Sequence, residues 1–349
     1  MECGAIAHGG HVVARLTEGT VVFVRHALPG EHVVVEITEG REGDRFLRGD
    51  AVRVLTASPH RVEAPCPFSG PDNCGGCDFQ HVDPSYQREL KTTVVREQLS
   101  RLAGIESDVV VEQVDPLLGW RSRMQYVELP APEGESRRGL HAHRSDVVVE
   151  VEACLIDAAP AAEGARTLER VLGHEFAVEP DGFWQPHVAA PRVLVETVLE
   201  LLQPQPGESA LDLYAGVGLF AAFLRERVGV SGWVTAIEGD RTAVEHAVTN
   251  TGAECVAADV QAWLEGPDAP EHVDLVVLDP PRTGAKKRVV DAIVQRTPRA
   301  VVYVACDPAA LARDLKTFAE HGYALTALRA FDLFPMTQHV ECVALLEPR

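Results

Sequence analysis

Residues 209–220 read SALDLYAGVGLF and combine a short apolar strand with a glycine turn. The strand runs directly into Gly216 and Gly218, and a helical pattern begins immediately after them. Small residues at such a junction allow a ligand to approach the backbone at the start of a helix. With Ala221 the spacing also satisfies the dinucleotide pattern GxGxxA, so the loop alone leaves a nicotinamide cofactor open.

Apolar strands and helices alternate along the chain from Pro180 to its end. Strand patterns lie at 209–215, 232–239, 274–281, 299–307 and 342–348, with helical patterns between the first four and after the fourth. This alternation predicts a doubly wound α/β domain with a mainly parallel sheet. In such a sheet the ligand sites lie at the carboxyl ends of the strands.

Acidic residues at these strand ends favour S-adenosylmethionine over a nicotinamide cofactor. Glu238 lies about 20 residues after Gly218, where a carboxylate can accept both hydroxyls of a ribose. Asp212 precedes the glycines, and Asp279 begins the sequence DPPR after another strand. Added negative charge suits a cationic sulfonium and opposes a pyrophosphate. Asp259 is a candidate for binding the adenine amine, although a surface aspartate would give the same pattern.

A cysteine and a glutamate complete the chemistry expected at this edge. Cys306 ends the strand AVVYVAC, which places it at the same edge of the sheet as Asp279. Carbon 5 of a pyrimidine is a poor nucleophile until a thiolate adds to carbon 6, so a cysteine here indicates covalent catalysis. Glu341 precedes the last apolar strand and could remove the proton from carbon 5 after methylation. The alternative for Cys306 is a buried structural thiol.

The part of the chain before Pro180 lacks this regular alternation of strands and helices. Residues 1–60 alternate short valine-rich runs with turns, which predicts a small β-barrel or sandwich. A helical pattern follows at 85–104, and further strand-like runs follow it at 119–129 and 146–156. These runs predict a separate middle domain of the α+β class.

Four cysteines mark this middle part. Cys66, Cys74 and Cys77 lie in a loop rich in glycine and proline, and Cys154 is the only other cysteine in the middle region. Four thiolates suit a [4Fe–4S] cluster or a structural zinc ion. One close pair with two dispersed cysteines favours the cluster, whereas His81 is a rival ligand in the zinc interpretation.

Composition indicates an ordinary globular protein. The chain has 349 residues, 46% of them hydrophobic, and a formal net charge of −20. These values exclude a small disulfide scaffold, collagen and a disordered tail. The negative charge does not favour a nucleic-acid partner, so any basic surface must be local. No stretch approaches a membrane span and the start does not resemble a signal peptide, so we expect a cytoplasmic protein with no membrane partner.

Taken together, these motifs resemble the RNA 5-methyluridine methyltransferases, a family that uses S-adenosylmethionine to methylate uridine in 23S rRNA and tRNA. The matching stretches are DLYAGVGLF, AIEGD, LDPPR, YVACDPAALARDL and FPMTQHVE, in that order. The stretch GGHVVARLTEGTVVFVRHALPGE resembles a TRAM domain, which is an OB-like RNA-binding barrel. Phe183, Trp184 and Gln185 resemble the segment that opens the catalytic domain of the family.

The resemblance implies roles for individual residues. It makes Cys306 the nucleophile and Glu341 the base. It assigns S-adenosylmethionine to Gln185, Tyr214, Glu238 and Asp279, and our own analysis of the strand ends adds Gly216, Gly218 and Asp259. It also matches the four cysteines to iron–sulfur ligands, namely Cys66, Cys74, Cys77 and Cys154.

We therefore predict an RNA (uracil-5-)-methyltransferase of three parts. These are an OB-like TRAM barrel at 1–60, a middle α+β iron–sulfur domain at 61–180 and a Rossmann-like class I methyltransferase domain at 181–349. The expected substrate is a flipped-out uridine in RNA, with 23S rRNA favoured and tRNA as the alternative, and we expect a monomer. The rival interpretations are a nicotinamide dehydrogenase in which Cys306 has no role and a catalytically silent RNA-binding protein.

Overall fold

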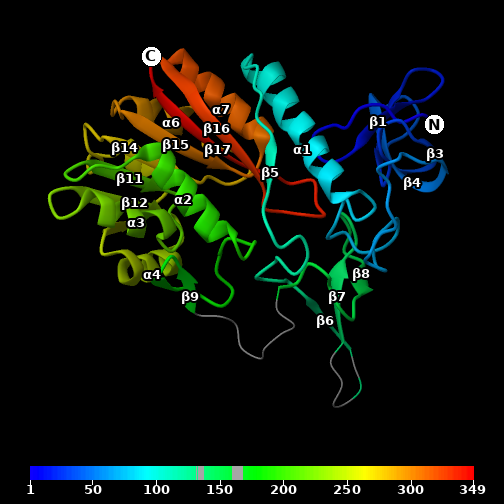
Figure 1. The fold of residues 1–349 in the computed structure, drawn as a ribbon, viewed down its shortest axis with the longest axis horizontal. Coiled ribbons are helices and arrows are strands. Elements are labelled where there is room, and N and C mark those ends of the chain that lie inside the picture. Colours follow the sequence, from blue (N-terminus) through cyan, green and yellow to red (C-terminus); the bar gives the residue numbers. More distant parts are fainter. Residues whose placement is uncertain (131, 133–136, 159–167) are drawn as a thin grey trace. The chain divides into compact units, whose positions relative to one another are not determined.

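The computed structural model describes residues 1–130, 132, 137–158 and 168–349. Contacts divide the chain into two compact units, neither of which is continuous in sequence (Figure 1). The first unit consists of Met1–Glu97, Asp115–Pro160 and Phe334–His339. The second unit consists of Gln98–Val114, Ala161–Leu333 and Val340–Arg349. The three-part division with boundaries near residues 60 and 180 stays a prediction.

The first unit begins with a four-stranded sheet. Its strands lie in the order β1-β2-β4-β3 and span Val12–Arg15 (β1), Val21–Arg25 (β2), His32–Glu39 (β3) and Phe46–Thr56 (β4). β2 and β4 pair in parallel, and the other two pairs are antiparallel. Alternate valines point inward because successive side chains of a strand face opposite sides, and Val12, Val22 and Val24 are fully buried.

A helix and a second small sheet complete the first unit. Helix α1 (Pro84–Gln98) packs Leu90 and Val94 against the core of the four-stranded sheet. Three short antiparallel strands follow, namely β6 (Val127–Leu129), β7 (Arg137–His141) and β8 (Val148–Glu150). The segment Phe334–His339 is held in this unit because the Met336 N–H donates to Gln87 Oε1 at 2.9 Å.

The second unit is built on an eight-stranded sheet in the order β13-β12-β11-β14-β15-β17-β16-β5. The strands are β5 (Val111–Gln113), β11 (Ser209–Leu213), β12 (Trp233–Glu238), β13 (Glu254–Ala257), β14 (Leu275–Leu278), β15 (Ala300–Ala305), β16 (Tyr323–Asp332) and β17 (Glu341–Pro348). β11 to β15 pair in parallel, while β17 runs antiparallel to both of its neighbours. The predicted doubly wound, mainly parallel sheet is confirmed.

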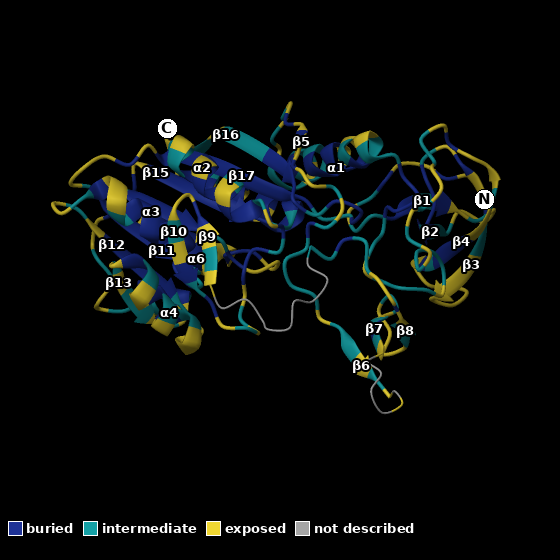
Figure 2. Ribbon diagram, turned by 60° about the horizontal axis from the view of Figure 1, so that its bottom comes forward, coloured by how far each residue is buried: buried dark blue, intermediate teal, exposed yellow. Residues whose placement is uncertain are grey.

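Two rows of helices pack against this sheet. One row consists of α2 (Ala190–Leu202), α3 (Leu219–Val228) and α4 (Arg241–Thr251), and the other of α5 (Val260–Leu264), α6 (Lys286–Val294) and α7 (Pro308–Glu320). A π-helical turn, Leu99–Ala103, packs on α7. Every residue of β14 and β15 is buried between the rows, which explains their uninterrupted apolar sequences. In Figure 2 the buried residues, coloured dark blue, are concentrated around β15.

A short hairpin joins the helical side of this unit. It is formed by β9 (Leu168–Val171) and β10 (His174–Ala177), which pair antiparallel. Phe176 of β10 is fully buried and contacts the rings of Trp184 and Phe223 at centroid distances of 5.8 and 6.1 Å. Aromatic packing of this kind anchors the segment that leads to Gln185.

Candidate active site and cysteine-lined cavity

The glycine turn after β11 is closely packed against α4. Gly218 has a φ of +86°, and a Cβ atom there would lie 2.2 Å from Thr251 Cγ2, so only glycine fits. Asn250 of α4 donates to the carbonyls of Val217 and Ala177, both at 3.0 Å. The turn is therefore preformed, with its backbone open to a ligand at the start of α3.

Glu238, at the end of β12, is tied to this turn. One carboxylate oxygen accepts from the Gly216 N–H at 2.9 Å, and the other accepts from the Asp240 N–H at 2.8 Å. Each oxygen can accept a further hydrogen bond, so the carboxylate keeps capacity for two ribose hydroxyls. Besides its predicted role in binding ribose, Glu238 therefore also stabilises the glycine turn.

Two buried acids lie beside the turn. Asp212 is fully buried, one of its oxygens accepts from the Ala221 N–H at 2.7 Å, and the other, Oδ1, is buried without a hydrogen-bond partner. Burial raises the pKa of Asp212 to about 8. Asp279 accepts from Gln185 Nε2 at 3.0 Å, and burial raises its pKa to about 7. Such a pair is costly in isolation and suits a cationic ligand.

Cys306 and Glu341 face each other across neighbouring strands. Ala305 pairs with Cys342 in the antiparallel ladder of β15 and β17, so the next step places Cys306 opposite Glu341. Burial, reinforced by the charge of Asp279, raises the pKa of Glu341 well above its ordinary value. Glu341 is only 3% exposed, and its Oε1 is buried without a hydrogen-bond partner.

Burial also raises the pKa of the Cys306 thiol, to about 12. The negative charges of Glu341 and Asp279 are the next largest causes and raise this pKa further. The charge of Asp307 raises it to a smaller extent. Arg282, in the loop after β14, acts in the opposite direction and lowers it. Cys306 therefore lies in a buried, acidic environment that opposes the thiolate, and Arg282 partly offsets this opposition.

The remaining cofactor candidates lie at the same edge of the sheet. Tyr214 follows β11 with a φ of +62°, and its pKa is raised to about 12 by burial and then by the charge of Asp259. Asp259 is exposed and accepts from the Ala262 N–H at 2.9 Å, which caps α5. Its other oxygen is not engaged in this cap, so a helix cap and an adenine contact are compatible.

Two residues without a predicted role lie beside this site. Arg282 is exposed within the motif LDPPR, and Phe183 is 71% exposed two residues before Gln185. Phe183 directly precedes the buried Trp184 in the sequence. Their position inside the quoted motifs is the signal by which the sequence could have marked them.

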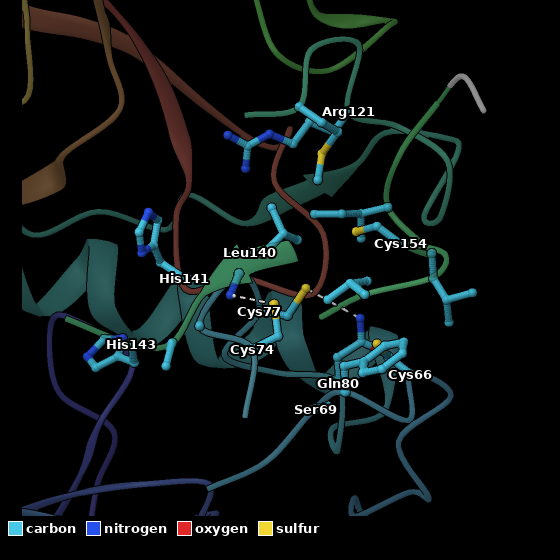
Figure 3. Close-up of a pocket in the computed structure, with 18 of the residues that line it drawn as sticks. Cys66, Ser69, Cys74, Cys77, Gln80, Arg121, Leu140, His141, His143 and Cys154 are labelled. Carbon is cyan, nitrogen blue, oxygen red and sulfur yellow. Dashed lines mark hydrogen bonds between the residues drawn. The ribbon is translucent and has the colours of Figure 1, made fainter. Parts of the chain in front are cut away.

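The first unit carries a separate site lined by cysteines. All four of the predicted thiols, those of Cys66, Cys74, Cys77 and Cys154, line one cavity of about 280 Å³ (Figure 3). The Gly76 N–H donates to Cys74 Sγ at 3.5 Å, and Gln80 Nε2 donates to Cys77 Sγ at 3.4 Å. Burial raises the pKa of Cys77 to about 12, while the hydrogen bond from Gln80 lowers it.

The rival ligand His81 lies elsewhere. Its ring packs near that of His26, with 6.1 Å between the centroids, and it does not line the cysteine cavity. Among the residues that the structure describes, no three His, Cys, Asp or Glu side chains are placed to hold a metal ion. The cavity therefore shows convergence of the four cysteines but not a metal centre.

The sheet, the glycine turn and the acidic strand ends define a class I S-adenosylmethionine-dependent methyltransferase. The family model described as methyltransferase small domain matches residues 190–303. A crystal structure of Pyrococcus abyssi tRNA (uracil-54, C5)-methyltransferase in complex with S-adenosyl-L-homocysteine shares this fold with a TM-score of 0.65. It is 24% identical and covers 99% of each chain.

Comparison with whole sequences places the chain more narrowly. It is 43% identical to a Streptomyces avermitilis protein described as an uncharacterized RNA methyltransferase, over 100% of this chain and 98% of the relative. The 23S rRNA (uracil(1939)-C(5))-methyltransferase RlmD of Alcanivorax borkumensis is 28% identical over 98% and 95% of the two chains. Family models for tRNA (Uracil-5-)-methyltransferase and for the TRAM domain match residues 270–349 and 4–52. The chain belongs to the RNA uracil-5-methyltransferase family with an N-terminal TRAM domain.

In the described part of the chain, no helix is long and apolar enough to cross a membrane.

Proposed function

We propose that this enzyme methylates carbon 5 of a uridine in RNA through a covalent adduct with Cys306. The observation that carries the proposal is the register of β15 and β17, which sets Cys306 opposite Glu341 beside the buried acid Asp279. Methylation of an unreactive carbon requires a thiol and a base beside the bound cofactor. Cys306, Glu341 and the buried acid Asp279 bring these groups together at one edge of the sheet.

The cofactor side fits S-adenosylmethionine better than a dinucleotide. Asp212 and Asp279 would oppose a pyrophosphate, whereas the unpartnered Asp212 Oδ1 suits a nearby cation. Gln185, Tyr214, Glu238 and Asp279 would hold the ligand, with the turn at Gly216 and Gly218 and the carboxylate of Asp259 as further contacts. When bound, S-adenosylmethionine supplies the methyl group and a positive charge.

Each protein group has a defined part in the proposed reaction. The Cys306 thiolate adds to carbon 6 of uracil, which makes carbon 5 nucleophilic. After carbon 5 has received the methyl group, Glu341 accepts its proton, and Cys306 leaves as a thiolate. The raised pKa of Glu341 makes this carboxylate a stronger base than an exposed glutamate.

The RNA must present its uridine at this edge. We propose that the base is flipped out of its stack and that the exposed ring of Phe183 provides a stacking surface for it. The names of the relatives support both 23S rRNA and tRNA as substrates, and we propose 23S rRNA as the first to test. All eight cysteines are free, which agrees with a reducing cytoplasm, and we propose that the enzyme acts there as a monomer.

We further propose that Cys66, Cys74, Cys77 and Cys154 bind a [4Fe–4S] cluster. The fit rests on their convergence on one cavity and on the N–H donors that point at two of the sulfur atoms. Bound there, the cluster would tie the loop before α1 to the segment after β8. Anaerobically purified protein should contain iron and sulfide and absorb broadly near about 400 nm. Colourless protein with stoichiometric zinc would overturn this part of the proposal.

Two variants test the covalent mechanism. Wild-type enzyme, Cys306→Ala and Glu341→Gln are incubated with S-adenosylmethionine and either 23S rRNA or tRNA transcripts. Cys306→Ala should give neither 5-methyluridine nor an adduct, because the first step is lost. Glu341→Gln should accumulate methylated RNA joined to Cys306, seen as a band that survives denaturing electrophoresis.

The buried neighbour Cys342 provides the matched control. Cys342 directly follows Glu341 and is buried. Cys342→Ala therefore removes a nearby thiol but keeps the proposed nucleophile Cys306, and the variant should retain activity. Formation of 5-methyluridine by Cys306→Ala would refute the assignment, and wild-type turnover by Glu341→Gln without an adduct would refute that of the base. Cofactor binding without methylation by the wild-type enzyme on either RNA would favour the silent RNA-binding protein.

A further inference from the structure

A buried aspartate on α7 holds the loop that carries Arg282. Asp314 is 5% exposed, and its Oδ2 accepts from the Tyr303 hydroxyl at 2.7 Å and the Ala285 N–H at 2.8 Å. A longer contact of 3.3 Å joins it to the Lys286 N–H. The Ala285 N–H is also 3.0 Å from the Tyr303 hydroxyl, so loop, strand and helix meet at one carboxylate.

Asp314 supplies a hydrogen-bond acceptor that the loop and the start of α6 lack by themselves. The first N–H groups of a helix need acceptors, and the residue before α6, Ala285, has no side chain that can cap it. Asp314 provides the acceptor from a different helix. Burying a carboxylate is costly unless several donors compensate for lost water, so these three contacts indicate a specific role for an acid.

The loop is also shaped to lie against this carboxylate. Gly284 has a φ of +79°, and a Cβ atom there would be 2.6 Å from Asp314 Oδ2. Lys286, at the start of α6, has a φ of +69°, which is unusual for a residue with a side chain. A strained backbone persists where surrounding contacts hold it, and Asp314 and Tyr303 supply such contacts here.

We propose that Asp314 and Tyr303 are positioning residues that hold the loop 279–285, and with it Arg282, at the carboxyl end of β14, next to the end of β15 that Cys306 follows. The loop begins at Asp279, which is joined to Gln185, and ends at Ala285, which is joined to Asp314. Both ends are therefore anchored, and Arg282 lies between them. The proposal rests on the proposed function only in taking Cys306 as the catalytic thiol.

The charged groups around Cys306 indicate what the anchor should change. Glu341 from β17, Asp279 after β14 and Asp307 after β15 all oppose the thiolate, and Arg282 favours it. If the loop is released, Glu341 and Asp307 remain in place because other strand ends carry them, whereas Arg282 is no longer held close to the thiol. The thiol of Cys306 should then ionise less readily.

The test measures the thiol directly. The protein is treated with iodoacetamide over a range of pH, and alkylation of the Cys306 peptide is followed by mass spectrometry. Asp314→Asn and Tyr303→Phe should slow alkylation at a given pH by roughly 3-fold to 10-fold, as Arg282→Ala should. Adding Arg282→Ala to Asp314→Asn should cause little further change, because both act through the same charge.

A second buried tyrosine supplies the control. Tyr323 is 6% exposed and donates its hydroxyl to the Pro298 carbonyl at 2.8 Å, away from the loop. Tyr323→Phe should lower thermal stability without changing the alkylation of Cys306. The proposal is overturned if Asp314→Asn and Tyr303→Phe behave like Tyr323→Phe, or if their effects add fully to that of Arg282→Ala. Methyl transfer by Cys306→Ala would refute the proposed function while leaving this result intact.

Discussion

Binding of S-adenosylmethionine should release a proton from the acidic side of the site. With pKa values of about 8 for Asp212 and about 7 for Asp279, both acids are partly protonated in the free enzyme. At about pH 7 Asp212 is then roughly nine-tenths protonated and Asp279 roughly half. A cation beside them favours the carboxylates, so at about pH 7 we expect release of roughly 1 to 1.5 protons for each ligand bound.

Calorimetry measures this release. Titrations with S-adenosylmethionine are carried out at one pH in buffers with different enthalpies of ionisation, and the slope of observed enthalpy against buffer enthalpy gives the number of protons. By the same linkage, affinity should rise by more than about tenfold between roughly pH 6 and pH 7. Above about pH 9 the release should disappear, because the acids have already ionised.

S-adenosylhomocysteine is the matched ligand, because it lacks the methyl group and the sulfonium charge. It should release clearly fewer protons, and its affinity should depend less on pH. Asp212→Asn should reduce the release caused by S-adenosylmethionine, since its amide does not titrate. Equal release by the two ligands, or enthalpies that are the same in every buffer, would refute the placement of the sulfonium beside these acids.

Three further outcomes are expected from the second unit. Glu238→Ala should weaken S-adenosylmethionine binding by about 1 to 3 kcal/mol because hydrogen bonds to ribose are lost; unchanged affinity by calorimetry would exclude that role, and thermal melting without ligand reports the separate loss at Gly216. Phe183→Ala should reduce methylation efficiency by about 1 to 3 kcal/mol of stacking while cofactor affinity stays constant, and Phe183→Trp should restore it; equal loss in both variants would argue against stacking. Gly218→Ala should lower thermal stability and cofactor affinity together, because its Cβ would overlap Thr251; wild-type affinity would show that the turn adapts.

Much of the candidate active site could be predicted from local sequence pattern. Asp212, Glu238, Asp279 and Cys306 each lie within or just after an apolar strand, and parallel strands bring their carboxyl ends to one edge. The spacing of apolar residues and the positions of turn residues predict these strands and their ends, because both depend on local backbone geometry and local burial. The fold class could therefore be predicted from the chain alone, whereas the family was predicted from the resemblance of its motifs to those of a known family.

Contacts between distant segments were decided only in three dimensions. β5, from Val111 to Gln113, pairs with β16 at the edge of the sheet, and Phe334–His339 joins the first unit although the chain on both sides belongs to the second. From the sequence, Asp314 would be predicted to lie on the exposed face of an amphipathic helix. In the structure it is buried and accepts a hydrogen bond from the loop after β14. A local pattern records whether a residue is apolar, but the partner of a buried polar group depends on how the whole chain packs, and no short window of sequence contains that information.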